Sequence, residues 1–382
     1  MSLTLILVVI LVALVFEYIN GFHDTANSIA TVVSTKVLTP TQAVMMAAAT
    51  NLLGALWGTA VAKTVSSGLI DAKVVTITSE VLICALLGGI VWNLLTWWLG
   101  LPSSSSHALI GGLGGAALAA SHNNWHSIIW SQPAADHWYN GKGLLWKVII
   151  PMFTSPVGGF ILGFLIMGGL FAVIYWCSNQ TGILQKISRP RWVNKFFGKV
   201  QIFSAALMGF MHGTNDAQKT MGIIALALVA GTTAGAFDGV PSWLSFLHTP
   251  PPQAGKTLEI ATWIKVACAL VMAAGTAAGG WRIIKTLGHK MVKLHPINGF
   301  AAETSSATMI GLATWLGIPV STTHNISAAI MGVGFAKRSN AIKWTVVERM
   351  IWAWILTIPV SAAIAYFLVR MLMSLGWISV PA

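Results

Sequence analysis

The chain has 382 residues, of which 55% are hydrophobic and only 8% charged, and its mean hydropathy is +0.75. A soluble domain carries about 25% charged residues, so the composition excludes an ordinary soluble protein and indicates an integral membrane protein. The formal net charge of +12 fits Lys and Arg gathered in cytoplasmic loops, so it does not predict a nucleic-acid partner.

The apolar stretches are long enough for helices. A helix needs about 20 residues to cross the hydrocarbon core, whereas a barrel strand needs only about 10 alternating ones. We therefore predict an all-α integral membrane protein in the lipid bilayer. Several stretches contain polar breaks, so broken or re-entrant helices would raise the ten candidate crossings to about twelve segments. The candidates lie at about residues 3–34, 40–63, 79–98, 102–122, 145–177, 200–231, 257–281, 297–316, 318–337 and 344–376.

The first stretch contains a polar patch, in which residues 21–27 read Gly-Phe-His-Asp-Thr-Ala-Asn. A charge in hydrocarbon costs roughly 3 kcal/mol or more, so Asp24 marks an ion or substrate path. Asp24 and Asn27 are three residues apart and share a helix face. We expect these two side chains to bind a cation or a proton, and we expect the helix to break near Asn20 and Gly21.

Residues 100–107 read Gly-Leu-Pro-Ser-Ser-Ser-Ser-His and open another apolar stretch. Proline suits the first turn of a helix, and serine there caps the free N–H groups. A helix N-terminus offers about +0.5 of a charge and several aligned N–H donors, which suits an anion. Ser104, Ser105 and Ser106 are therefore candidate anion ligands, and His107 is a candidate proton relay. The alternative is that these residues are ordinary caps beside a packed helix.

The polar loop 179–199 divides the chain into a first repeat, residues 1–178, and a second repeat, residues 200–382. Five crossings on each side would invert the second repeat relative to the first, as is common in secondary transporters. A cytoplasmic 179–199 loop places thirteen Lys and Arg residues inside and six outside. This bias fits the positive-inside rule and predicts that both termini lie outside.

The second repeat contains both motifs again, in the same order. Residues 212–219 read His-Gly-Thr-Asn-Asp-Ala-Gln-Lys, and residues 317–324 read Gly-Ile-Pro-Val-Ser-Thr-Thr-His. The sequence therefore predicts one site between two related halves. Lys219 could pair with Asp216 or contact the anion directly. The further site residues are Asn215 and Asp216 for the cation, Ser321, Thr322, Thr323 and Lys219 for the anion, and His324 as the counterpart of His107.

No sequence pattern points to an enzyme. There is no Gly-x4-Gly-Lys-Ser/Thr for nucleotides, no His-Glu-x-x-His for zinc, and no evident nucleophile with a base. The cysteines, Cys84, Cys177 and Cys268, are isolated and odd in number, so the sequence predicts neither a disulfide framework nor a metal cluster. We expect no cofactor and no metal site, and the driving energy must come from an ion gradient.

The motifs at 18–27, 100–107 and 319–324 resemble those of the inorganic phosphate transporter (PiT) family, in its bacterial low-affinity branch. The family signature is a Gly-x-x-Asp-x-x-Asn element, repeated as a His-Gly-x-Asn-Asp type of element. The resemblance implies a symporter in the bacterial inner membrane, with phosphate between two hairpins and cations near the aspartates. It also implies proton-coupled uptake of phosphate, or of a neutral divalent metal-phosphate complex, whereas eukaryotic members use sodium.

One departure bears on the coupling ion. Lys219 occupies the position that corresponds to Asn27 in the first repeat, so a sodium site there would lose an oxygen ligand. This favours protons. The alternatives are sodium coupling, sulfate in place of phosphate, and a passive anion channel lined by the same hydroxyl-rich helix ends. The many small and aromatic residues are compatible with a homodimer.

Overall fold

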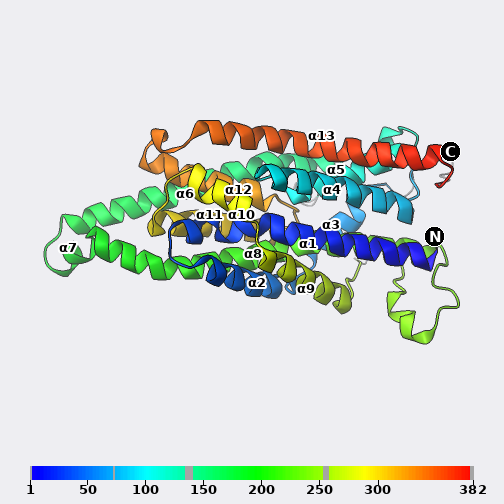
Figure 1. Cartoon of the computed structure of the whole chain (residues 1–382), viewed down its shortest axis with the longest axis horizontal. Helices are drawn as coiled ribbons and strands as arrows, with labels where there is room; N and C mark the ends of the chain where they lie inside the picture. Colours follow the sequence, from blue (N-terminus) through cyan, green and yellow to red (C-terminus); the bar gives the residue numbers. More distant parts are fainter. Residues whose placement is uncertain (1, 72–73, 134–140, 253–257, 379–382) are drawn as a thin grey trace.

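The computed structural model describes residues 2–71, 74–133, 141–252 and 258–378, and these residues are almost entirely helical, with two isolated β-bridges and no longer strand among them. Lys73 and Lys256, which enter the predicted charge bias, lie outside the described residues. The helices run roughly along the long axis of the molecule (Figure 1). Both termini lie at one end and helix α7 at the other. The all-α class predicted from the sequence is confirmed.

The helices before the central loop are α1 (Leu3–Ser34), α2 (Pro40–Ala55), α3 (Ala60–Ser67), α4 (Ser79–Leu99), α5 (Ser105–Ala120) and α6 (Ile150–Ser178). Those after it are α7 (Ile183–Ile187), α8 (Pro190–Thr233), α9 (Thr262–Ala278), α10 (Trp281–Lys285), α11 (Pro296–Trp315), α12 (Thr322–Lys337) and α13 (Trp344–Ser374). Short 3₁₀ or π turns occupy Trp125–Ser127, Leu145–Ile149, Ser242–Leu247, Thr286–Lys290 and Ser339–Ala341.

Four described helical segments are long and apolar enough to cross a membrane by themselves: α1, α4, Leu145–Ser178 and α13. Two bent pairs bring the number to as many as six, namely α2 with α3 at 70° and α9 with Trp281–Lys290 at 59°. Helices α5 and α12 have 16 residues each, which is short of the roughly 20 that a crossing needs. These two helices therefore begin inside the fold, after the extended segments that contain Pro102 and Pro319.

Helices α1 and α8 run antiparallel through the centre. Thr220 of α8 donates to Glu17 of α1, whereas Thr35, near the other end of α1, donates to Gln201 near the start of α8. Rising residue numbers on α1 thus meet falling numbers on α8. The two central helices of the predicted repeats are inverted relative to each other.

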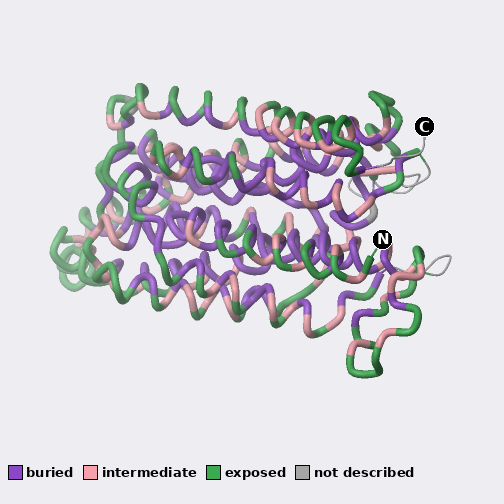
Figure 2. The backbone as a smooth tube through the Cα atoms, turned by 45° about the vertical axis from the view of Figure 1, so that its right-hand side comes forward, coloured by how far each residue is buried: buried purple, intermediate pink, exposed green. Residues whose placement is uncertain are grey.

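The two large clusters of the apolar core lie one after the other along α1 and α8. Members of the first include Ile6 and Ile19 of α1 and Ala217 and Leu228 of α8. Members of the second include Ala26 and Val32 of α1 and Phe197 and Met208 of α8. Buried polar residues lie between them, at the middle of both helices. Figure 2 shows buried backbone running through the interior while exposed residues gather on the outer helices and at the ends.

Pairs of small residues let helices of the two halves approach closely. On α5, a Cβ on Gly111 or Gly115 would meet the backbone of Ile358 or Ala362 in α13. On α6, Gly159 and Gly163 lie in the same way against α12. Glycines four residues apart are a common contact surface between membrane helices, because they bring the backbones together. The two halves therefore interlock.

The break predicted near Asn20 and Gly21 is wrong, because α1 is continuous from Leu3 to Ser34. Gly21 lies where α1 crosses α9. A Cβ at this position would lie 2.5 Å from the backbone oxygen of Met272 and 3.1 Å from the Cα atom of Gly275 in α9. The glycine is needed for close approach of two backbones, while the α1 hydrogen bonds continue through it.

Gly21→Ala is expected to lower the thermal stability of the detergent-solubilised protein, since overpacking against backbone atoms costs about 1–3 kcal/mol. Gly169→Ala in α6 is the matched control, because no atom lies within 4 Å of its added methyl group. Replacing glycine by alanine in a helix interior stabilises the helix by up to about 1 kcal/mol, so Gly169→Ala should not lower the melting temperature. Equal melting temperatures for the two variants would contradict the crossing described above.

Candidate functional site

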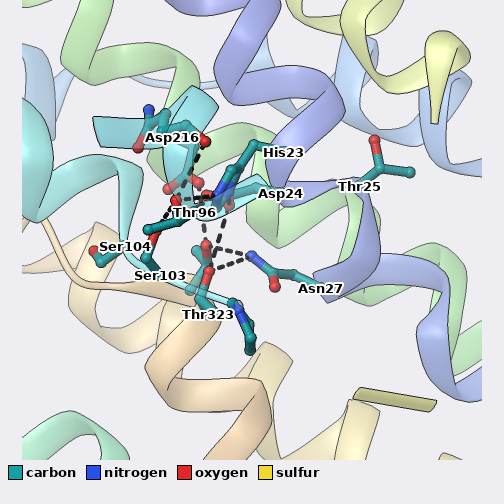
Figure 3. Close-up of polar contacts among 12 residues, drawn as sticks. His23, Asp24, Thr25, Asn27, Thr96, Ser103, Ser104, Asp216 and Thr323 are labelled. Carbon is teal, nitrogen blue, oxygen red and sulfur yellow. Dashed lines mark hydrogen bonds and ion pairs between the residues drawn. The ribbon is translucent and has the colours of Figure 1, made fainter. Parts of the chain in front are cut away.

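The middle of α1 and α8 forms a polar centre that is closed to solvent. Asp24 is 2% exposed, Asp216 1% and His212 0%. Figure 3 shows Asp24 and its neighbours among ribbons of several helices from both halves. Burying two carboxylates is costly unless cations or hydrogen-bond donors surround them. The partners of each aspartate therefore define the chemistry of the site.

Asp24 contacts side chains of two helices, α1 and α12, which are in turn linked to neighbouring polar groups. His23 Nδ1 lies 2.6 Å from Asp24 Oδ1, and His23 Nε2 lies 3.1 Å from Thr96 Oγ1 in α4. Thr323 Oγ1, at the start of α12, lies 3.5 Å from Asp24 Oδ1. Asn27 Nδ2 donates to Thr323 Oγ1 at 2.9 Å (Figure 3). The first aspartate motif of the sequence thus contacts the second hydroxyl motif.

Asp216 is paired with two basic side chains on its own helix. Lys219 donates to Asp216, and His212 Nε2 lies 3.1 Å from Asp216 Oδ2. Thr322 Oγ1 of α12 donates to the same oxygen at 3.1 Å. His212 was not predicted as a cation-site residue, although its position four residues before Asp216 places it on the same helix face. That spacing is the signal that could have identified it.

Lys219 links the two hydroxyl motifs. Its Nζ atom donates to Ser106 of α5 and, at 3.0 Å, to the backbone oxygen of Val320 just before α12. Of the two possibilities raised by the sequence, the pairing of Lys219 with Asp216 is present, and the same nitrogen also contacts residues of both hydroxyl motifs. Lys219 is only 3% exposed, so protein groups rather than solvent surround its ammonium group.

The N-termini of α5 and α12 meet at this centre. Ser104 and Ser321 are their capping residues, and each hydroxyl accepts a hydrogen bond from the N–H three residues later, at 3.2 Å and 3.1 Å. Ser106 Oγ donates to the backbone oxygen of Val320 at 3.3 Å. Ser105 Oγ has no hydrogen-bond partner among the described atoms. The Ser105 hydroxyl is thus not engaged by any of the described side chains or backbone groups, whereas Ser104 and Ser321 are occupied as caps.

The two histidines of the hydroxyl motifs lie against each other. The ring centroids of His107 and His324 are 4.9 Å apart, and His324 stacks on Trp354 at 4.2 Å. Both histidines are 1% exposed. His107 Nδ1 and His324 Nε2 have no hydrogen-bond partner within the described part of the chain. The pairing suggested by the repeated sequence is therefore also a spatial one.

The Asn215 amide nitrogen contacts residues outside the two aspartate motifs. Its Nδ2 atom donates to Thr314 at 2.9 Å and to the backbone oxygen of Ile318 at 3.3 Å. Both acceptors belong to the end of α11 and the segment that leads to α12. The contacts of Asn215 therefore position that connection, and none of them brings it to Asp24.

One set of side chains has the geometry of a cation site. One ligand atom each from Asp24, His212 and Asp216 lies within 4.8 Å of the others. Two carboxylates and an imidazole fit a small cation or a shared proton. The Lys219 ammonium group already contacts Asp216, and its charge opposes the binding of a second cation beside it. The charge of Lys219 therefore makes this donor set less favourable for a metal ion than the same set would be beside a neutral residue.

Comparisons with known proteins agree with one another. The sequence profile described as Phosphate transporter family matches residues 20–365. A probable low-affinity inorganic phosphate transporter of Bacillus subtilis (strain 168) is 42% identical over 377 residues, covering 97% of this chain and 100% of the relative. A protein of Rhizobium meliloti (strain 1021) with the same description is 42% identical over 372 residues, with coverages of 96% and 97%.

A solved structure has a similar fold. It is described as "The sodium-dependent phosphate transporter", and it matches with a TM-score of 0.75 at 23% sequence identity. The match covers 97% of this chain and 100% of that chain. The likeness extends over the whole helical arrangement described above.

Proposed function

Since this chain belongs to the phosphate transporter family, we propose that it moves inorganic phosphate across the bacterial plasma membrane as a proton-coupled symporter, by alternating access. The phosphate ion binds between the two repeats, residues 1–178 and 200–382. Each repeat contributes one aspartate and one hydroxyl-rich helix start. One half then rocks or gates against the other around this fixed site.

The observation that carries the proposal is the meeting of two helix N-termini beside two buried aspartates. The starts of α5 and α12 contact each other through Ser106 and Val320, and Lys219 contacts both. Helix N-termini hold oxyanions through free N–H groups and the helix dipole. The Ser105 hydroxyl supplies one further donor for a tetrahedral anion. The Thr322 and Thr323 hydroxyls and the Lys219 ammonium group supply the others when phosphate replaces some of their present partners in the protein.

The coupling proton is assigned to the aspartates. Asp24 with Asn27, and Asp216 with His212, provide carboxylates whose charge changes when a proton binds. A proton binds a single carboxylate oxygen as an O–H bond, whereas a hard metal cation needs several oxygen ligands around it. Beside Asp216 the Lys219 ammonium group already supplies a positive charge, and this charge repels a second cation. Sodium coupling is the second candidate, because the donor atoms of Asp24, His212 and Asp216 also converge within 4.8 Å.

The test is uptake of radiolabelled phosphate into proteoliposomes that contain the purified protein. A proton gradient, a sodium gradient, excess sulfate and added magnesium are compared side by side. Proton-driven accumulation that sulfate does not inhibit supports the proposal. Accumulation only with sodium would transfer the coupling to that ion, and sulfate accumulation would change the substrate. Equilibration without accumulation would indicate a passive channel.

The double substitution Ser105→Ala with Thr322→Ala is expected to raise the KM for phosphate roughly 100-fold. Hydrogen bonds to a charged group contribute about 1.5–3 kcal/mol each, and 1.4 kcal/mol is about tenfold. Ser104→Ala is the control, because its hydroxyl caps α5 and its loss costs about 1 kcal/mol of stability. An unchanged KM in the double variant, measured by initial-rate uptake, would remove these hydroxyls from the anion site.

A further inference from the structure

Glu17 is a buried acid outside the contacts described for the central site. It lies on α1 seven residues before Asp24, which is about two turns or 10 Å along the helix axis. The side chain is 0% exposed. Thr220 of α8 donates to its Oε2 atom, whereas Oε1 has no hydrogen-bond partner in the described part of the chain. No Lys, Arg or His nitrogen among the described residues forms an ion pair with it.

The surroundings of Glu17 oppose a negative charge. The charged and titratable side chains that face it are Asp216 and Lys219 from α8 and Cys268 from α9. Lys219 is already engaged by Asp216, Ser106 and Val320. An ionised carboxylate here would lose its hydration and gain no cation of its own, and such a charge is costly to bury.

The neighbouring amide also lacks a donor. Asn20 lies one turn after Glu17 on the same face of α1, and its Oδ1 atom has no partner among the described residues. The Asn20 side chain also interacts directly with the Glu17 carboxyl group, yet Glu17 Oε1 and Asn20 Oδ1 are both buried without a hydrogen-bond partner among the described residues. A proton on Glu17 Oε1 is the donor that this arrangement lacks, because only the protonated carboxyl group can donate.

Glu303 is a second buried carboxyl group, and both of its oxygens accept hydrogen bonds from neighbouring side chains. It is also 0% exposed. Thr31 and Gln201 donate to its Oε1 atom at 2.5 Å and 3.0 Å, and Ser204 donates to its Oε2 atom. Both oxygens of Glu303 therefore have donors from neighbouring side chains. Glu17 differs in that its Oε1 atom has no hydrogen-bond partner among the described residues.

We propose that Glu17 is a proton-binding site that carries the coupling proton between the aspartate centre and the membrane surface nearer the N-terminus of α1. This inference rests on the proposed proton symport. Glu17, Asn20 and Asp24 lie on one face of α1, and the proton passes along this face. The proton binds Oε1 from water on one side and leaves to the aspartate centre or water on the other, so only an O–H bond forms and breaks. The gap of about 10 Å requires water molecules or Asn20 between the two acids.

The experiment separates proton movement from phosphate binding. Purified wild-type protein, Glu17→Gln, Glu17→Asp and Glu80→Gln are placed in proteoliposomes. Exchange of labelled for unlabelled phosphate is measured at equal pH, where the carrier need not release its proton. Net uptake is then measured with an imposed proton gradient, and a pH-sensitive dye inside the vesicles records proton entry. Glu80, in the first turn of α4, is the matched control for replacing a glutamate by glutamine.

In Glu17→Gln, phosphate exchange is expected to stay within about twofold of the wild-type rate. Net uptake and proton entry are expected to fall by at least about tenfold, because the substitution slows only the proton-driven step. Glu17→Asp, which restores a carboxyl group, should recover proton entry in part, and Glu80→Gln should match wild type in both assays. Proton-driven uptake that persists in Glu17→Gln would overturn the inference. So would loss of exchange together with uptake, because Glu17 would then serve phosphate binding or folding.

The wild-type measurement keeps the two proposals apart. If phosphate uptake by the wild type brings no protons into the vesicle, the proposed proton symport fails and this inference fails with it. If the wild type carries protons and Glu17→Gln does so equally well, only the assignment of Glu17 fails.

Discussion

Asp24→Asn is expected to abolish accumulation of phosphate against its gradient while the protein remains folded. The substitution keeps the shape of the side chain and removes its charge and its ability to bind a proton. Asn can still accept from Thr323 and lie beside His23, the two neighbours that contact Asp24 Oδ1. The expected fall in proton-driven uptake is at least about 100-fold, since a loss of about 2.7 kcal/mol in the driven step corresponds to that factor.

The control for this variant is Asp238→Asn, which makes the same chemical change at an exposed residue between α8 and α9. Both variants are compared with wild type at matched protein per vesicle, and melting curves confirm that each is folded. Near-normal uptake by Asp24→Asn would remove Asp24 from the coupling mechanism. A melting temperature far below that of the control would show that Asp24 is needed for folding.

Lys219→Met is expected to have the largest effect on stability. It removes a buried ammonium group that pairs with Asp216 and donates to Ser106 and to the backbone of Val320. Removing one partner of a buried ion pair typically costs 3–5 kcal/mol, because the remaining charge loses its compensation. The variant should melt well below wild type, and its phosphate uptake should be lost.

The double variant Asp216→Asn with Lys219→Met tests the cause. It removes both charges, so most of the stability should return, while uptake should remain absent because the coupling carboxylate and the anion contact are gone. Thermal melts in detergent with and without phosphate provide the measurement. A single Lys219→Met variant as stable as wild type, or a double variant no more stable than the single, would contradict the ion-pair explanation.

The sequence predicted the class of protein, and it identified the motifs that meet at the polar centre, because both depend on local features. Long apolar stretches require helices in a membrane, and the repeated motifs named Asp24, Asp216 and the two hydroxyl runs. It did not show which of these hydroxyls are occupied as caps. The side-chain oxygens of Ser104 and Ser105 differ only in their contacts in three dimensions.

The one error in the helix prediction has a similar origin. Gly21 next to Asn20 is locally a sign of a break, but its actual neighbour is the backbone of α9, more than 250 residues later. The contacts of the Asn215 amide nitrogen also involve distant residues, at the end of α11 and in the segment after it. Such contacts depend on how helices are rotated about their axes. No short sequence pattern shows how a helix is rotated about its axis, because the rotation depends on which other helices pack against each of its faces.

The glycine contacts on α5 and α6 have a consequence for how the protein is made. Their partners, α13 and α12, follow much later in the sequence. During synthesis the ribosome delivers residues 1–178 to the membrane well before either partner exists. The glycine surfaces of α5 and α6 must therefore face lipid, or an insertion factor, until α12 and α13 have been made. Docking of α13 along α5 then closes a helix pair whose first member was inserted early.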